Sequence, residues 1–148
     1  MLAMYHDYRI QNPSKGFLCV NELEFGVPLQ TPMMSIFREK LTPSTFRNVV
    51  LEARRFGGPD SLNAGIVDAV GGLDEVLGLI RDRKLLNKAE TGIYGTMKEE
   101  MYARVLDGLD DHAGNLAWRE KVESRNVMLR EEGLKRVESW SKSPSAKL

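Results

Sequence analysis

The chain contains a single cysteine, Cys19, so it cannot form a disulfide bond within itself. Its two histidines, His6 and His112, lie far apart and lack the short spacings that structural zinc sites use. These residues match none of the common sequence patterns of a metal centre, and we expect no metal. An unpaired cysteine also suits a reducing compartment.

The sequence has no excess charge of either sign, because 21 Lys and Arg residues balance 21 Asp and Glu residues. A chain without net charge has no overall field to attract nucleic acid or an anionic membrane surface. The sequence also lacks an apolar run of the roughly 20 residues that a membrane-spanning helix needs. We therefore expect no nucleic-acid partner and no membrane span.

The composition that is present is that of an ordinary globular domain, with 42% apolar and 28% charged residues among 148. Apolar residues at helical spacing predict helices over most of the chain. Thr42 followed by Pro43 marks one helix start, since threonine caps helices and proline suits their first turn. The helices are expected near residues 1–5, 32–41, 43–57, from residue 59, and at 73–80, 94–109 and 112–140.

Three short segments have the pattern of β-strands instead. Residues 6–11 alternate in character, and residues 17–20 and 65–72 are short apolar stretches bordered by turn residues. Two or three isolated short strands do not form a stable sheet. The pattern therefore predicts an incomplete sheet that requires companion strands from outside the chain.

The chain divides into three expected parts: a core over residues 1–86, a helical region over 87–141 and a flexible tail over 142–148. The tail ends in Ala146-Lys147-Leu148, which differs by one residue from the Ser-Lys-Leu address read by the peroxisomal import receptor. This ending predicts that receptor as a partner and the peroxisome as the location.

Residues 19–28, CVNELEFGVP, place an ionisable side chain, Glu22, among apolar neighbours. Most glutamates are solvated surface groups, and that is the simplest interpretation of any one of them. Here Glu22 follows the apolar segment 17–20, and at the end of a buried strand its carboxyl would be poorly hydrated and hold its proton more tightly. Such a carboxyl can take up and return a proton near neutral pH, so Glu22 is the candidate general base.

A second carboxylate, Glu24, follows two residues later. In an extended chain the two side chains would point the same way, and in a turn they would diverge. Gly26 and Pro28 favour a turn, so we interpret Glu24 as a solvent-facing charge. The candidate substrate-binding residues surround Glu22 or lie on the next apolar helix: Asn21, Phe25, Val27, Pro28, Met33, Met34 and Phe37.

Three stretches, LAMYHDYRI, GFLCVNELEFGVP and SLNAGIVDAV, resemble in order the second half of the enoyl-CoA hydratase/isomerase (crotonase) family. The family pattern is Leu-Ala-x-x-x-Asp-x-x-Ile, then Glu-x-x-apolar-Gly, then Ala-x-x-x-Gly-Leu-Val-Asp, with Ser61 here replacing the alanine. The match covers residues 1–85. It implies an α/β fold of crotonase type that is incomplete: the mostly helical C-terminal portion of a ββα spiral, with two or three short strands and trailing helices.

The resemblance also implies a chemistry. Hydratases of the family hold a water between two glutamates, and the two positions correspond here to Met1 and Glu22. A methionine at the first position resembles the 3-to-2 enoyl-CoA isomerases, in which one base moves a proton from C2 to C4 of the acyl thioester. We therefore expect an enoyl-CoA isomerase of peroxisomal fatty-acid β-oxidation, with Glu22 as the base, a fatty acyl-CoA as substrate and no cofactor.

The largest departure from the family is the absence of its first half, which supplies both backbone N–H groups of the oxyanion hole. Removing one such donor typically costs about two to three orders of magnitude in rate. We therefore expect a truncated form with little or no activity alone, whose full-length form is a homo-oligomer. Two alternatives stay open: a non-catalytic crotonase-like module that oligomerises through its C-terminal helices, and an enoyl-CoA hydratase or thioester hydrolase.

Overall fold

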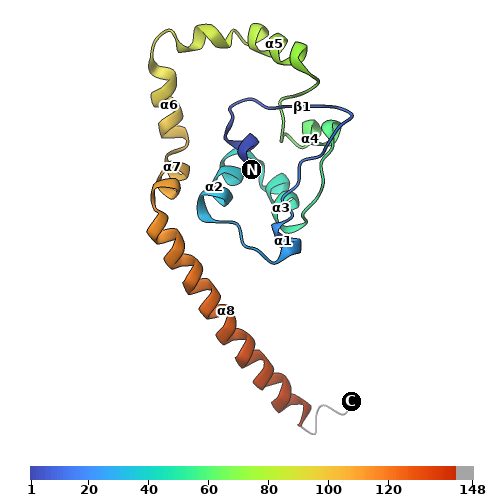
Figure 1. The fold of residues 1–148 in the computed structure, drawn as a ribbon, viewed down its shortest axis with the longest axis vertical. Coiled ribbons are helices and arrows are strands. Elements are labelled where there is room, and N and C mark those ends of the chain that lie inside the picture. Colours follow the sequence, from blue (N-terminus) through green and yellow to red (C-terminus); the bar gives the residue numbers. More distant parts are fainter. Residues whose placement is uncertain (143–148) are drawn as a thin grey trace. The chain divides into compact units, whose positions relative to one another are not determined.

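The computed structural model describes residues 1–142, which form parts of two compact units. The first unit runs from Met1 to Asp110 and the second begins at Asp111. Figure 1 shows the first unit as a set of helices with a short pair of strands, and the second as one long helix. The tail from residue 143, including Ala146-Lys147-Leu148, lies outside the described residues.

The order of elements agrees with a mostly helical chain. The elements are η1 (Leu2–Tyr5), β1 (Ile10–Gln11), α1 (Glu22–Phe25), α2 (Thr31–Lys40), α3 (Pro43–Leu51), α4 (Gly58–Asn63), β2 (Ala69–Val70), α5 (Leu73–Asp82), η2 (Leu85–Ala89), α6 (Ile93–Met101), α7 (Ala103–Asp110) and α8 (His112–Ser141).

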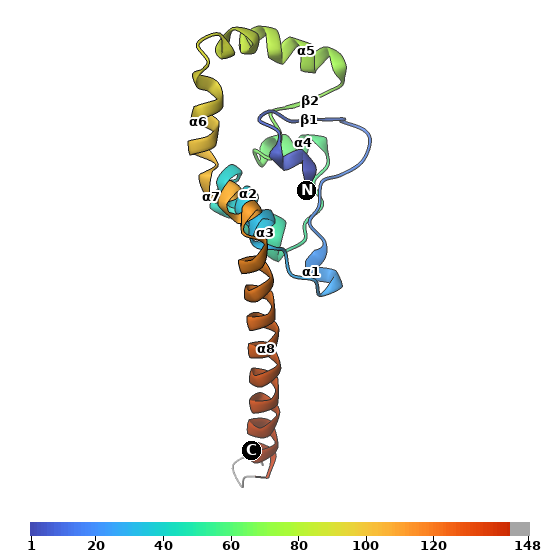
Figure 2. The same ribbon diagram turned by 60° about the vertical axis from the view of Figure 1, so that its left-hand side comes forward.

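The two strands β1 and β2 pair in parallel, with Ile10 opposite Ala69 and Gln11 opposite Val70. They lie side by side in Figure 2. Their positions confirm the strands expected within residues 6–11 and 65–72, although each is only two residues long. A pair this short is far from a stable sheet, so the helices supply most of the packing in the first unit.

The segment 17–20 differs from its predicted strand. Leu18 forms a single antiparallel bridge with Phe56, in which each backbone N–H donates to the other residue's carbonyl oxygen. Phe17 is exposed, whereas Val20 is buried. The strand prediction is wrong in extent, because Phe56 is the one residue among those described whose backbone pairs with this segment.

Helix α3 begins where the sequence predicted, with Thr42 at the cap and Pro43 at the first helical position. The Thr42 hydroxyl accepts a hydrogen bond from the Thr45 backbone N–H over 3.3 Å. The predicted end near residue 57 is wrong, because α3 stops at Leu51. The chain then extends so that Phe56 can pair with Leu18 and bury its ring.

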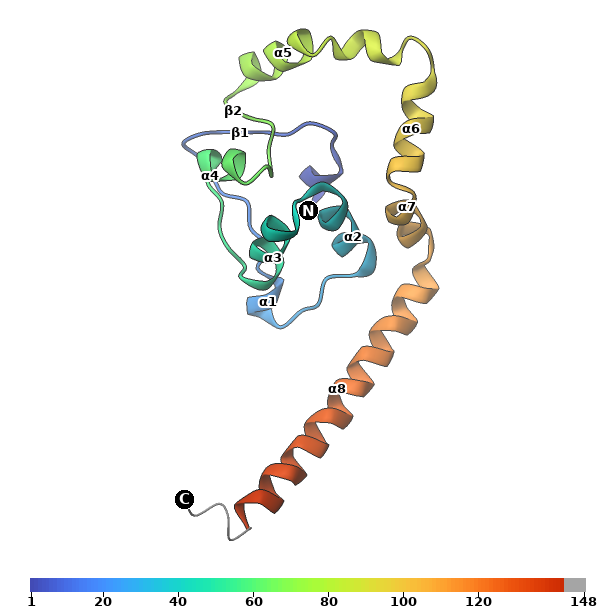
Figure 3. The ribbon, with the colours of Figure 1, turned by 180° about the vertical axis from the view of Figure 1, so that it is seen from behind.

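The helix expected over residues 94–109 is two helices, α6 and α7, with a break at Tyr102. The break lets α7 pack along α2, as Figure 3 shows, and buries Val105. An unbroken apolar periodicity carries no sign of this change of direction. The core of the first unit consists of Met4, Val20, Leu29, Ile36, Phe37, Leu41, Val49, Phe56, Ile66, Val67 and Val105.

The second unit is described as α8, and none of the 30 residues of this helix is buried. Its start is capped by Asp111, whose side chain accepts a hydrogen bond from the Gly114 backbone N–H. Across residues 1–142, no helix is both long enough and apolar enough to cross a membrane.

Candidate functional site

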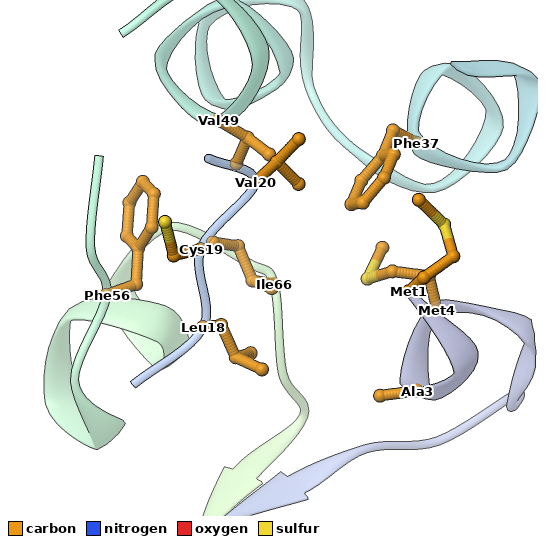
Figure 4. Close-up of a pocket in the computed structure, with 10 residues that line it drawn as sticks. All are labelled: Met1, Ala3, Met4, Leu18, Cys19, Val20, Phe37, Val49, Phe56 and Ile66. Atoms are coloured by element: carbon orange, nitrogen blue, oxygen red, sulfur yellow. The ribbon is translucent and has the colours of Figure 1, made fainter. Parts of the chain in front are cut away.

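A small apolar cavity of about 40 Å³ lies in the first unit, next to the segment that leads to Glu22. Figure 4 shows Met1, Met4 and Phe37 on one side of this cavity, with Leu18 and Ile66 across from them. Apolar walls exclude water and suit the carbon chain of a ligand. The lining residues are Met1, Ala3, Met4, Leu18, Cys19, Val20, Phe37, Val49, Phe56 and Ile66.

Glu22 is the first residue of α1 and follows the cavity-lining Val20 by two positions. Its side chain is half-buried, and its Oε2 atom is buried without a hydrogen-bond partner in residues 1–142. An unpartnered buried carboxylate oxygen costs free energy. A proton or a ligand that completed its bonding would remove that cost, so the geometry is compatible with a proton-transferring group.

Glu22 is not itself among the residues that line the cavity. The regular strand that was expected to hold it is also absent, because the chain turns into α1 at this residue. Glu24 lies in the same short helix and is exposed, as the turn interpretation predicted. The two carboxylates therefore sit in different environments, and Glu22 is the less hydrated one.

The other predicted site residues do not converge on one place. Phe37 is buried and lines the cavity, whereas Met33 and Met34 are half-buried and pack against the core without lining it. Asn21 precedes α1 without a side-chain capping bond. The remaining three, Phe25, Val27 and Pro28, are exposed.

Sequence reasoning missed most of the cavity wall. Met1 and Met4 come from a segment that was predicted to be a helix, and Cys19 and Ile66 come from segments that were predicted to be strands. The spacing of apolar residues predicts that such residues are buried. It does not predict whether they leave a cavity between them. Among residues 1–142, no cluster of His, Cys, Asp or Glu could hold a metal ion.

A polar cluster lies on a different part of the first unit. The Asp7 carboxylate accepts a hydrogen bond from the Tyr94 hydroxyl over 3.1 Å and lies 2.8 Å from Lys98 Nζ. Nearby, Lys40 Nζ donates to the His6 carbonyl oxygen over 2.6 Å. These contacts join α2 and α6 to the turn that follows η1.

Three curated enoyl-CoA delta isomerases of Arabidopsis thaliana are similar to this chain. Isomerase 1, named peroxisomal, is 30% identical over 111 residues, which is 72% of this chain and 46% of that protein. Isomerase 3 is 24% identical over 79% of this chain and 52% of that protein. The chain thus spans about half the length of these relatives. No family model matches the chain.

Solved structures agree on the fold. An enoyl-CoA hydratase/isomerase family protein from Pseudomonas syringae matches with a TM-score of 0.62 and 25% identity, over 74% of this chain and 48% of that one. A probable enoyl-CoA hydratase from Mycobacterium tuberculosis matches with a TM-score of 0.65 and 19% identity, over 82% and 53%. The incomplete crotonase-type fold is therefore confirmed. Together these similarities identify the chain as a protein of the enoyl-CoA hydratase/isomerase (crotonase) family that spans about half the length of its curated relatives.

Proposed function

We propose that this chain carries the catalytic base of an enoyl-CoA isomerase, which moves a double bond from C3 to C2 of a fatty acyl-CoA in β-oxidation. The observation that carries the proposal is the buried and unpartnered Oε2 atom of Glu22. Glu22 lies two positions after a segment, Leu18 to Val20, that lines an apolar cavity. The isomerase names of the curated relatives support the same activity.

The proposed reaction needs one base. The Glu22 carboxylate takes a proton from C2 of the 3-enoyl thioester, and the C–H bonding pair forms a double bond from C1 to C2 while the thioester oxygen becomes negative. The oxygen lone pair then re-forms the C1–O double bond, and the C1–C2 double-bond pair moves to C2–C3. The C3–C4 pair takes the proton from the protonated Glu22 at C4. The C3–C4 double bond has then become a C2–C3 double bond, and no co-reactant has been used.

A hydratase is the weaker candidate, because hydration needs a water molecule held and activated next to the acyl chain. The wall of the cavity is made of carbon and sulfur side chains, among them Met1. By the family resemblance, Met1 corresponds to the first of the two glutamates that hold the water in hydratases. Solved relatives carry the name hydratase at 19–23% identity, a level that supports the fold.

Product analysis separates the two reactions. This chain spans about half of the Arabidopsis isomerase 1. For the assay, the part of that isomerase that precedes the region of similarity is therefore fused to Met1. We expect the fusion protein to convert a 3-enoyl-CoA into the 2-enoyl-CoA, and to leave that product unhydrated. Formation of 3-hydroxyacyl-CoA from the 2-enoyl-CoA would overturn the assignment in favour of a hydratase.

Peroxisomal location is part of the proposal. Two of the three Arabidopsis relatives are named peroxisomal, and this chain ends in Ala146-Lys147-Leu148. A fluorescent protein fused upstream of the chain should enter peroxisomes through the import receptor. Deletion of Leu148 should leave the fusion in the cytosol, and unchanged import after that deletion would rule out this address.

A second candidate function is a non-catalytic module that assembles through its C-terminal helix. The observation that favours it is α8, which has no buried residue yet exposes Trp118, Leu129 and Trp140. Helices are stabilised mainly by packing of an apolar face, so a homo-oligomer would give these side chains a partner. Sedimentation at increasing concentration tests this: a Trp118→Ala and Trp140→Ala variant should remain monomeric where the wild type associates.

A further inference from the structure

A second groove, of about 430 Å³, lies in the first unit between η1, α2, α6 and α7. Its size falls within the range of small-molecule sites. The rings of Tyr5, Tyr94 and Tyr102 line it, together with Ile36 and Val105, which are each 2% exposed and form its base. We call it the tyrosine groove, and it is separate from the cavity next to Glu22.

Apart from Lys98 and Glu99, the groove presents mainly carbon atoms, because two of its three tyrosine hydroxyls are bound to protein groups. The Tyr5 hydroxyl donates to the Pro32 carbonyl oxygen over 3.4 Å, and the Tyr94 hydroxyl donates to Asp7 over 3.1 Å. The Tyr102 ring is covered by Lys40 Nζ, 4.9 Å from its centre. The site therefore suits an apolar ligand.

Charged side chains border the groove: Lys98 and Glu99 line it, and Lys40 lies over the Tyr102 ring. Lys98 Nζ, which lines the groove, is paired with Asp7, and the Arg9 guanidinium donates to the carbonyl oxygens of Ile66 and His6. Lys40 Nζ has the His6 carbonyl oxygen as its hydrogen-bond acceptor, and no carboxylate of residues 1–142 lies within ion-pair distance of it. Lys40 is therefore a cation at the rim that has no carboxylate partner among the described residues.

The surroundings of Lys40 change the pKa of its amine. Burial of the side chain and then the positive charge of Arg9 lower the pKa of the Lys40 amine below its ordinary value. An anion next to the amine would oppose both effects, because opposite charges at close range favour the charged form. A ligand with a negative group at Lys40 would therefore be stabilised there by charge as well as by its apolar part.

We propose that the tyrosine groove binds a fatty acid, with the carboxylate at Lys40 and the alkyl chain over Ile36 and Val105. The Tyr102 ring, shared by the groove and by Lys40, connects the two ends of this site. Such a site would let the protein sense a free fatty acid independently of catalysis at Glu22. The proposal does not depend on the isomerase reaction, and the Glu22→Gln variant should bind the fatty acid normally.

Calorimetric titration of the full chain with decanoate tests the proposal. The Leu106→Trp variant, at a groove-lining residue that is 42% exposed, should abolish binding by filling the groove. Its matched control is Leu116→Trp on α8, at a leucine that is 45% exposed and outside the groove, which should bind as the wild type does. Lys40→Met should weaken binding about tenfold, the effect of losing one charge-assisted hydrogen bond.

Two further ligands complete the test. Decyltrimethylammonium has the same alkyl chain with the opposite charge, and it should bind at least about tenfold more weakly than decanoate. Decanoyl-CoA carries the chain as a thioester without a carboxylate, and it should not displace decanoate. Equal affinity for the two charged amphiphiles, unchanged decanoate binding in Lys40→Met, or binding of decanoyl-CoA alone would each overturn the proposal. Circular dichroism checks the fold of each variant. The comparison of decanoate with decyltrimethylammonium needs only the wild-type protein, so it tests the proposal even if a variant does not fold.

Discussion

Lys98 Nζ lies 2.8 Å from the Asp7 carboxylate, which joins α6 to a residue 91 positions earlier in the sequence. Burial alone would raise the pKa of Asp7, but hydrogen bonds from Lys98 and Tyr94 outweigh it and lower that pKa below its ordinary value of 3.8. The hydrogen bond to Asp7 in turn raises the pKa of Lys98. No residue of α6 is buried, so this ion pair is a principal attachment of α6 to the residues that follow η1.

The Asp7→Asn variant should lower the free energy of unfolding near neutral pH by up to about 1 kcal/mol, since partly exposed ion pairs contribute little more. Because folding lowers the pKa of Asp7, its contribution is fully present above the unfolded value of 3.8 and is lost as the pH falls through the folded value. Urea unfolding at neutral and acidic pH measures this. The variant and the wild type should differ at neutral pH and converge in acid.

A double-mutant cycle provides the control for Asp7→Asn. Lys98→Met alone should lower stability by a similar amount, and the double variant should lose less than the sum of the two. Additive losses would show that the two side chains stabilise the protein through other contacts.

The Thr42→Ala variant should cost about 1 kcal/mol of unfolding free energy, because the Thr45 N–H at the start of α3 loses its acceptor. Thermal unfolding measures the loss. Thr42→Ser keeps the hydroxyl and should restore most of the stability. If serine and alanine were equally destabilising, the methyl group of Thr42 rather than its hydroxyl would be responsible.

The Phe56→Ala variant should destabilise the first unit by about 3 to 5 kcal/mol. The Phe56 side chain is 2% exposed, and the residue lines the cavity and pairs with Leu18. Phe25→Ala is the matched control, since Phe25 is 73% exposed, and it should change stability by no more than about 0.5 kcal/mol. A large loss from Phe25→Ala would mean that its exposed ring is packed in solution.

Local sequence features predicted the helices well, because their causes are local. Thr42 and Pro43 mark the start of α3 by hydrogen bonding and by backbone geometry, and the spacing of apolar residues gave α2 and α5. The end of α3 could not be predicted, since it depends on Phe56 pairing with Leu18, a residue 38 positions earlier. The break at Tyr102 depends in the same way on α7 packing against α2.

The candidate site was predictable in its chemistry more than in its shape. The position of Glu22 after an apolar segment indicated a poorly hydrated carboxyl, and its buried Oε2 atom agrees with that expectation. The shape of the cavity depends on which side chains surround it and leave it unfilled. Two of them, Met1 and Ile66, come from distant parts of the chain. Its role, and that of the exposed Phe25, stay predictions until a ligand is bound.

The central claim is that Glu22 transfers the proton, and the turnover of two glutamine variants tests it most directly. Both are made in the fusion with the upstream part of the Arabidopsis isomerase and assayed with a 3-enoyl-CoA. Glu22→Gln should lower kcat about 100-fold or more, the usual contribution of a general base. Glu24→Gln, at an exposed residue of the same short helix, should leave kcat unchanged. Equal turnover of the Glu22→Gln variant and the unsubstituted fusion would contradict the account.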